Sequence, residues 1–312
     1  MLSHYYSSES AENLLARKET FVVVEFGNRC APSATPGLIQ TGVSSLPVET
    51  QREVWCIEDS PVRRGVTGRC HWSESKDLLC TAIWLNPEQC KDLAGETKAA
   101  YVELLEFVQS TDFPHPFRFW NYIPHINRGE GDDEEYKKFC AGRLGAFSHM
   151  DIPSKHFPAA SALGHQSEGA VIYVFSSMNK GIQHENPRQQ KAYQYPRQYG
   201  ISSPSFSRAT SLELGKQSRF FISGTASILG YETTYLNEFK GQLTTTLDNI
   251  EQLLQNKPDY CNLQSLKVYL RDNTHYDDAR KLISERFPRV ATLYTHADVC
   301  RQNLLVEIEA HS

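Results

Sequence analysis

The C-terminal segment contains an acidic residue in a position where it could do chemistry. From residue 304 the sequence LLVEIEA predicts a strand, in which side chains alternate between two faces. Glu307 therefore shares a face with Leu305 and Glu309. If apolar neighbours enclose this face, desolvation will raise the pKa of Glu307, and the residue will hold a proton near neutral pH. The alternative is that Glu307 and Glu309 form the solvent-exposed face of an antiparallel strand.

One arginine is predicted to point inward. Arg143 follows Tyr136 by seven residues, which places it on the apolar face of the helix predicted over residues 132–147. A buried guanidinium needs an anion beside it. That anion is either a bound ligand or a structural Asp or Glu, and the sequence alone leaves both open.

A long segment with little apolar pattern runs from residue 181 to residue 211. Loops of this length are usually functional or disordered, and the aromatic content of this one argues against disorder. It is either a loop that contacts a ligand or a structured crossover that covers a sheet edge. Its candidate binding residues are Tyr195, Arg197, Tyr199 and Arg208.

The composition of the 312-residue chain is that of an ordinary globular protein, with 40% hydrophobic residues and a formal net charge of −5. No stripe of Lys and Arg predicts a nucleic acid partner, and no apolar run approaches the roughly 20 residues of a membrane span. The eight cysteines form no Cys-x-x-Cys pair, so we interpret them as reduced thiols. No clustered motif predicts a metal, and without a visible signal peptide we expect a cytoplasmic protein.

The predicted elements follow the same order twice. Both halves run strand, helix, strand, helix, Phe-Pro, strand, strand, with Phe157-Pro158 corresponding to Phe287-Pro288 and residues 171–174 to residues 305–308. This divergent duplication predicts an α+β fold with helices on one face of each mixed sheet. The expected organisation is an N-terminal extension packed on the core (1–70), a first unit (71–180), a connecting loop that contributes to the site (181–211) and a second unit (212–312).

The last hundred residues resemble the RidA/YjgF family, which shares its α+β fold with the Bacillus-type chorismate mutase. The matching segments are FISG (221–224), LDNI (247–250), VYLRD (268–272), Phe287-Pro288 and VEIEA (306–310). In that family the first Glu of the terminal motif is linked to activating water, which would be Glu307. RidA-type proteins also place a carboxylate-binding Arg fifteen residues before this Glu, where this chain has Thr292. The departure disfavours an imine hydrolase, which stays an alternative.

From about Phe117 onward the chain resembles the chorismatase family more closely. The matching motifs are FWNYIPHIN (119–127), FCAGRLGAF (139–147), YPRQYG (195–200) and HADVCR (296–301). Chorismatases remove pyruvate from chorismate, and the resemblance implies neither a metal nor an organic cofactor. It hardly covers residues 1–70.

The resemblance implies a role for each candidate residue. Chorismate is a dianion with two carboxylates and an enol ether, so its binding calls for arginine clamps and its cleavage for an acid. Glu307 is the expected acid, which protonates the methylene carbon. A non-catalytic protein that senses a small anionic metabolite is the alternative, and it would not need Glu307. The expected substrate-binding residues are Arg143, Tyr195, Arg197, Tyr199, Arg208, Gly224 and Arg301.

The resemblance also bears on the product. Family members that form 3-hydroxybenzoate have Gly in the strand-turn motif and Cys seven residues before the catalytic Glu, whereas hydrolytic members have Ala and Gln there. This chain has Gly224 and Cys300, so we favour 3-hydroxybenzoate and count Cys300 with Glu307 as catalytic. Hydrolysis to a dihydroxycyclohexadiene carboxylate and mixed formation of 3- and 4-hydroxybenzoate are the alternatives. We expect a monomer or a small homo-oligomer.

Overall fold

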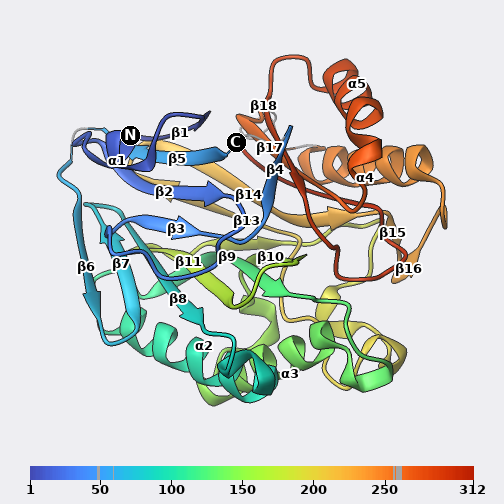
Figure 1. The fold of residues 1–312 in the computed structure, drawn as a ribbon, viewed down its shortest axis with the longest axis horizontal. Coiled ribbons are helices and arrows are strands. Elements are labelled where there is room, and N and C mark those ends of the chain that lie inside the picture. The colour runs from blue at the N-terminus through green and yellow to red at the C-terminus, as the bar shows by residue number, and fades with distance from the viewer. Residues whose placement is uncertain (48–49, 59, 256, 258–261) are drawn as a thin grey trace.

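The computed structural model describes residues 1–312 except 48–49, 59, 256 and 258–261 (Figure 1). The described residues form three larger sheets of four, six and seven strands and one two-stranded ribbon. Helices α2 and α3 lie on one side of the molecule and α4 and α5 on the other, with the sheets between them (Figure 1). The predicted α+β class is therefore confirmed.

The N-terminal sheet has the strand order β1-β5-β2-β3. Strand β2 is almost entirely buried because its run of β-branched and aromatic residues packs on both faces, with Val23 against α1 and Val22 and Val24 against the rest of the molecule. The elements of this sheet are β1 (Leu2–Ser7), α1 (Ala11–Leu15), β2 (Thr20–Phe26), β3 (Leu38–Gln40) and β5 (Gln51–Ile57).

The first unit has the strand order β10-β9-β11-β8-β7-β6 and carries two helices, which pack on one face of the sheet. The predicted boundary at residue 70 falls inside the β6–β7 hairpin, so β6 belongs to this sheet. The elements are β6 (Arg63–Thr67), β7 (Cys70–Glu74), β8 (Leu78–Leu85), α2 (Leu93–Gln109), β9 (His115–Pro124), α3 (Glu135–His149), β10 (Ala159–His165) and β11 (Ala170–Ser177).

The second unit has the strand order β12-β13-β14-β19-β17-β18-β4. Two of these strands come from outside the predicted unit: β4 (Ser44–Leu46) from the N-terminal region and β12 (Ile182–His184) from the connecting segment. The other elements are β13 (Ala209–Leu214), β14 (Gln217–Ala226), α4 (Phe239–Leu254), β17 (Ser265–Leu270), α5 (Tyr276–Arg286), β18 (Ala291–His296) and β19 (Val306–His311), with the ribbon β15 (Ile228–Leu229) and β16 (Glu232–Thr233).

The two units have the same connectivity, β8-α2-β9-α3-β10-β11 in the first and β14-α4-β17-α5-β18-β19 in the second. In each, the second and third strands pair in parallel, and the last strand lies antiparallel between the first and the second. The duplication predicted from the order of elements is therefore present in the fold.

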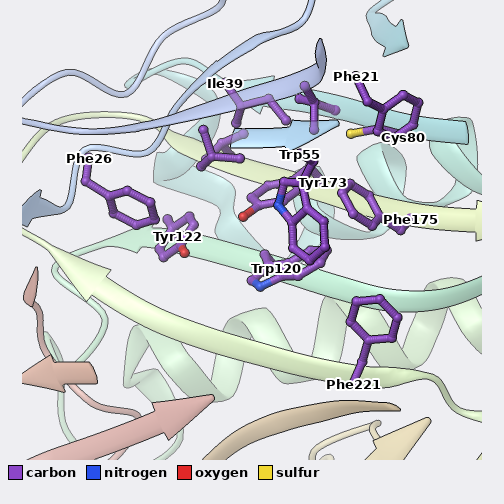
Figure 2. Close-up of a cluster of buried hydrophobic side chains, with 14 of the residues drawn as sticks. Phe21, Phe26, Ile39, Trp55, Cys80, Trp120, Tyr122, Tyr173, Phe175 and Phe221 are labelled. Carbon is purple, nitrogen blue, oxygen red and sulfur yellow. The ribbon is translucent and has the colours of Figure 1, made fainter. Parts of the chain in front are cut away.

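The three sheets meet at one central core (Figure 2). Trp55 of the N-terminal sheet packs edge to face against Phe175 of β11, with ring centres 5.2 Å apart, and Phe221 of the second unit contacts the same cluster. Large aromatic side chains bury much apolar area per residue, so this contact joins all three sheets into one body. The N-terminal region therefore packs on the core.

No helix among the described residues is long and apolar enough to cross a membrane. Seven cysteines in the described part of the chain are free thiols, whereas Cys261 lies outside the described residues. Within the same part of the chain, no group of three or more His, Cys, Asp and Glu residues could hold a metal ion.

Candidate active site

A cavity of about 580 Å³ is lined by residues of both units and of the segment that connects them. Its walls include α3 and the loop before it, β10, the connecting segment, β14 and the segment that leads into β19. Eight of the nine residues predicted for the site line it: Glu307, Cys300, Arg143, Tyr195, Tyr199, Arg208, Gly224 and Arg301.

Glu307 lies on β19 between Ala226 of β14 and Tyr269 of β17, and only 4% of its surface is exposed. Burial raises the pKa of its carboxyl from 4.5 to about 8, and the nearby charge of Glu309 adds to this effect. No group among the described residues donates a hydrogen bond to the carboxyl. The acid therefore stays largely protonated at neutral pH, as the sequence predicted.

The alternative interpretation of β19, with Glu307 and Glu309 on a solvent-exposed face, is wrong. Glu309 is 5% exposed because the first sheet covers this face of β19. It accepts hydrogen bonds from Arg118 Nη2 at 2.7 Å and from Lys267 Nζ at 2.8 Å. Burial alone would raise the pKa of Glu309, but these two cations outweigh it and lower the pKa to about 2.

Gly224 lies in a bulge, since the β14–β19 register shifts between Ile222 and Thr225. Its N–H donates to Ser161 Oγ at 2.9 Å. A Cβ atom at this position would lie 1.9 Å from Oε1 of Glu307, well inside van der Waals contact. Glycine therefore leaves the carboxyl of Glu307 in its place, whereas alanine would force it to move.

Arg143 points inward from α3 and is 1% exposed, as predicted. Its guanidinium carbon lies 4.9 Å from the ring centre of Phe139, and its Nε and Nη2 find no hydrogen-bond partner among the described residues. No Asp or Glu of the described chain pairs with it. Of the two anions that the sequence left open, the structural one is absent from the described part, so the free donors of Arg143 favour a bound anion.

Two further arginines line the cavity, and both guanidinium groups lie near the ring of Tyr195. Arg208 is 3% exposed and donates from Nη2 to the hydroxyl of Tyr195 at 2.8 Å, while its Nε has no partner among the described residues. The guanidinium carbon of Arg301 lies 3.8 Å from the ring centre of Tyr199. Neither forms an ion pair with an Asp or Glu of the described chain. The two tyrosines therefore hold the arginines by hydrogen bonding and stacking and leave their charges uncompensated.

Arg197 does not belong to this group. Its side chain is 64% exposed and makes a bidentate contact with Asp132, with nitrogen–oxygen distances of 2.9 and 2.7 Å. The short turn Arg197–Tyr199 places Tyr199 in the cavity wall and leaves Arg197 at the surface. The structure therefore does not bring Arg197 into the cavity with the other residues predicted for the site.

Cys300 is half-buried in the cavity wall. Burial raises the pKa of its thiol to about 12, and the nearby Glu307 adds to this effect. Because the thiolate is the nucleophilic form of cysteine, Cys300 is a small, neutral side chain at neutral pH and not a nucleophile.

Ser161 and Phe206 are two of the wall residues that were not predicted. Ser161 of β10 donates to Glu309 Oε2 at 2.6 Å and accepts from Gly224 and Arg118. Phe206 of the connecting segment packs its ring between Arg143 and Arg208, 6.0 and 5.2 Å from their guanidinium carbons. The run of small residues at 160–162 was the available signal for Ser161, because small side chains in a buried strand leave room for a ligand.

The fold and the cavity define a class of duplicated α+β proteins with a buried acid and unpaired arginines between the two units. Residues 53–176 match the family model described as "Chorismatase FkbO/Hyg5-like, N-terminal". A 3-hydroxybenzoate synthase from Streptomyces hygroscopicus is 36% identical over 230 residues, which is 68% of each chain. A chorismatase from Streptomyces rapamycinicus is 32% identical over 294 residues, 89% of this chain and 87% of that one. The chain belongs to the chorismatase family.

One solved structure agrees with this assignment. A chorismatase crystal structure at 1.08 Å resolution superposes with a TM-score of 0.91 and 27% identity, and the match covers 100% of this chain and 98% of that one. RidA from an Antarctic Psychrobacter matches 34% of this chain and 86% of its own, with 18% identity and a TM-score of 0.30.

Proposed function

We propose that this protein converts chorismate into 3-hydroxybenzoate and pyruvate, with Glu307 as the acid. The observation that carries the proposal is a buried, protonated carboxyl that faces a cavity with three arginines free of carboxylate partners in the described chain. One relative named as a 3-hydroxybenzoate synthase and others named as chorismatases support the substrate.

The charges of the cavity suit a dianion. Arg143, Arg208 and Arg301 bring three positive charges, and Glu307 brings none while it is protonated. The wall also contains Glu130 and the ion pair of Lys137 with Glu134, so positive charge remains in excess. Guanidinium groups pair with carboxylates through two parallel hydrogen bonds, and Arg143 has two free nitrogens to offer. A volume of about 580 Å³ lies within the usual range for sites that bind small molecules.

The chemistry begins with a proton transfer from Glu307 to the terminal methylene carbon of the enolpyruvyl group. The oxocarbenium-like centre that forms is positively charged, so a carboxylate left at Glu307 stabilises it. The neighbouring ring hydroxyl then attacks the carbon that bears the ether oxygen. That C–O bond breaks, pyruvate leaves with the ether oxygen, and the hydroxyl proton returns to Glu307. The epoxide opens and loses its ring proton to give 3-hydroxybenzoate, so no water is consumed.

Gly224 and Cys300 support the aromatic product over the diene diol. Neither side chain offers a strong hydrogen bond that would hold a water molecule beside the ring, whereas the amide of a glutamine would. Gly224 also leaves the Glu307 carboxyl in place, since a Cβ atom there would overlap it. A diene diol would require water as the nucleophile, and a mixture with 4-hydroxybenzoate would require a second route of ring opening.

Incubation of the purified protein with chorismate, followed by chromatography, tests the proposal. We expect equal amounts of pyruvate and 3-hydroxybenzoate, one solvent deuterium in the methyl group of pyruvate in D₂O, and no ¹⁸O from labelled water in the aromatic product. A non-aromatic diol in place of the aromatic product would indicate hydrolysis instead. Binding of chorismate without release of pyruvate would indicate a sensor, and turnover of imines alone would indicate a RidA-like enzyme.

A further inference from the structure

A second carboxylate lies two residues beyond Glu307 on the same face of β19. Glu309 accepts four hydrogen bonds, whose donor–acceptor distances lie between 2.6 and 2.8 Å. The donors come from three strands of the two units: Arg118 and Trp120 of β9, Ser161 of β10 and Lys267 of β17. A carboxylate has about four acceptor positions, so the capacity of Glu309 is filled.

These same donors are unavailable to Glu307. The hydroxyl of Ser161 donates its one hydrogen to Glu309, and it accepts hydrogen bonds from the Gly224 N–H and from Arg118. A hydroxyl has one donor and two acceptor sites, so all hydrogen-bonding sites of Ser161 are occupied. Arg118 directs Nη2 at Ser161 and Glu309, and it directs Nη1 at the carbonyl of Phe119. Glu307 thus lies beside a dense set of donors and receives none.

The charges around Glu309 are balanced. Lys267 bridges Glu309 and Glu53 at 2.8 Å to each, and Arg118 is the second cation. Two cations and two carboxylates therefore share the interface. His4 and His311 adjoin it, and burial lowers the pKa of both, which keeps them neutral. With Glu309 in place, the positive charges of this cluster are matched by carboxylates other than Glu307.

The other groups that face Glu307 come from each element packed against it. They are Glu309 on its own strand, Tyr269 on β17, Arg118 on β9, Arg208 before β13 and Cys300 before β19. Tyr269 and Cys300 are neutral, because burial raises the pKa of both groups. Arg118 and Arg208 favour the carboxylate form of Glu307, whereas Glu309 opposes it. Glu309 is therefore the one acidic group among them that opposes ionisation.

We propose that Glu309 is a positioning residue that keeps Glu307 in its acid form by taking up the donors and charges of the sheet interface. The inference deepens the proposed function and rests on it. Without Glu309, Arg118, Lys267 and the hydroxyl of Ser161 would each lose one acceptor, and the carboxylate of Glu307 on the same face of β19 would take the place of that acceptor.

The test is Glu309→Gln, compared with wild type in the pH dependence of pyruvate release under saturating chorismate. Loss of the acid form of Glu307 should move the alkaline limb of the profile at least one pH unit lower, and release at pH 8 should fall about fivefold or more. Glu53→Gln is the matched control. It removes one charge from the same cluster, but Glu53 contacts Lys267 and His4 rather than Arg118 and Ser161. It leaves one cation of the cluster unbalanced but keeps Glu309 and its four donors in place, so we expect its limb to move clearly less than that of Glu309→Gln.

A readout without turnover separates this inference from the proposed function. The infrared band of a protonated carboxyl that disappears in Glu307→Gln reports the acid form directly. Its midpoint should fall in Glu309→Gln even if the protein does not act on chorismate. Glu309→Gln combined with Lys267→Met keeps the charges balanced, frees Arg118 and Ser161, and covers the case in which the single variant fails to fold. An unchanged midpoint in the variant that folds, or an equal shift in Glu53→Gln, would overturn the proposal.

Discussion

Replacement of Glu307 by glutamine removes the acidic proton and nearly preserves the shape of the side chain. Glutamine has nearly the same volume and keeps a polar head, so the cavity should retain its form, but it has no acidic proton to transfer. General acid catalysis typically contributes about 10²–10⁴-fold, and release of pyruvate should fall by that factor. Binding of chorismate, measured by calorimetry, should stay within a few fold of wild type, because the three arginines are untouched.

The same variant should change how stability depends on pH. Glu307 holds its proton up to about pH 8 in the folded protein, whereas the unfolded chain releases it near pH 4.5. The stabilisation from this raised pKa is fully present below pH 4.5 and is lost as the pH rises through about 8. Each pKa unit is worth about 1.4 kcal/mol, so the whole window corresponds to roughly 5 kcal/mol of unfolding free energy.

Urea unfolding at several pH values between 5 and 8.5 measures this effect. The unfolding free energy of Glu307→Gln minus that of wild type should rise by about 1.4 kcal/mol per pH unit across the window, because glutamine cannot ionise. If the difference in unfolding free energy does not change with pH, Glu307 has an ordinary pKa and is not a buried acid. A variant that keeps more than about a tenth of wild-type turnover would remove Glu307 from the mechanism.

Three further variants test the other residues predicted for the site. Arg143→Ala should weaken chorismate binding by roughly 1.5–3 kcal/mol; an unchanged KM would exclude it as a clamp. Arg197→Ala should change KM by less than about twofold, because an exposed ion pair contributes little; a tenfold rise in KM would show that Arg197 binds substrate. Cys300→Gln combined with Gly224→Ala should move the product from 3-hydroxybenzoate towards the diene diol while pyruvate release continues at a lower rate, because a Cβ atom at position 224 displaces the Glu307 carboxyl; an unchanged aromatic fraction on chromatography would show that these positions do not determine the product.

Local periodicity predicted those parts of the site that depend on one element. The seven-residue spacing from Tyr136 places Arg143 on the buried side of α3, and the alternation in β19 places Glu307 and Glu309 on one face. Periodicity does not say what covers that face. In this protein the first sheet covers it, so both acids are buried, and the partners of Glu309 come from positions 42 to 191 residues away in the sequence.

The sequence also gave no basis for choosing among the arginines of the connecting segment. Arg197 lies among tyrosines and Arg208 lies two residues after Phe206, yet Arg197 is exposed and paired with Asp132 whereas Arg208 is buried against Tyr195. The direction of each side chain depends on short turns that hydrophobic pattern does not encode. The same reason applies to β4 and β6, whose short and partly polar sequences joined the sheets of the two units across the predicted boundary at residue 70.

The duplication accounts for the position of Glu307 beside Glu309, a carboxylate whose acceptor sites are all occupied. Strand β11 of the first unit and β19 of the second have the same place in their sheets, between equivalent neighbours. The registers define four pairs of equivalent positions. The pairs are Arg118 with Lys267, Trp120 with Tyr269, Tyr173 with Glu307, and Phe175 with Glu309.

Arg118 and Lys267 are thus equivalent residues, and both bind the single carboxylate of Glu309. In the first unit the position of Glu309 is occupied by Phe175, a residue of the central core, so two cations would meet one acid at the interface. Glu53 of the N-terminal sheet supplies the second carboxylate, at 2.8 Å from Lys267. Residues 1–70, which the family resemblance hardly covers, therefore supply the carboxylate that completes the charge balance behind the site. Because that balance is met without Glu307, the acid is left free to carry a proton.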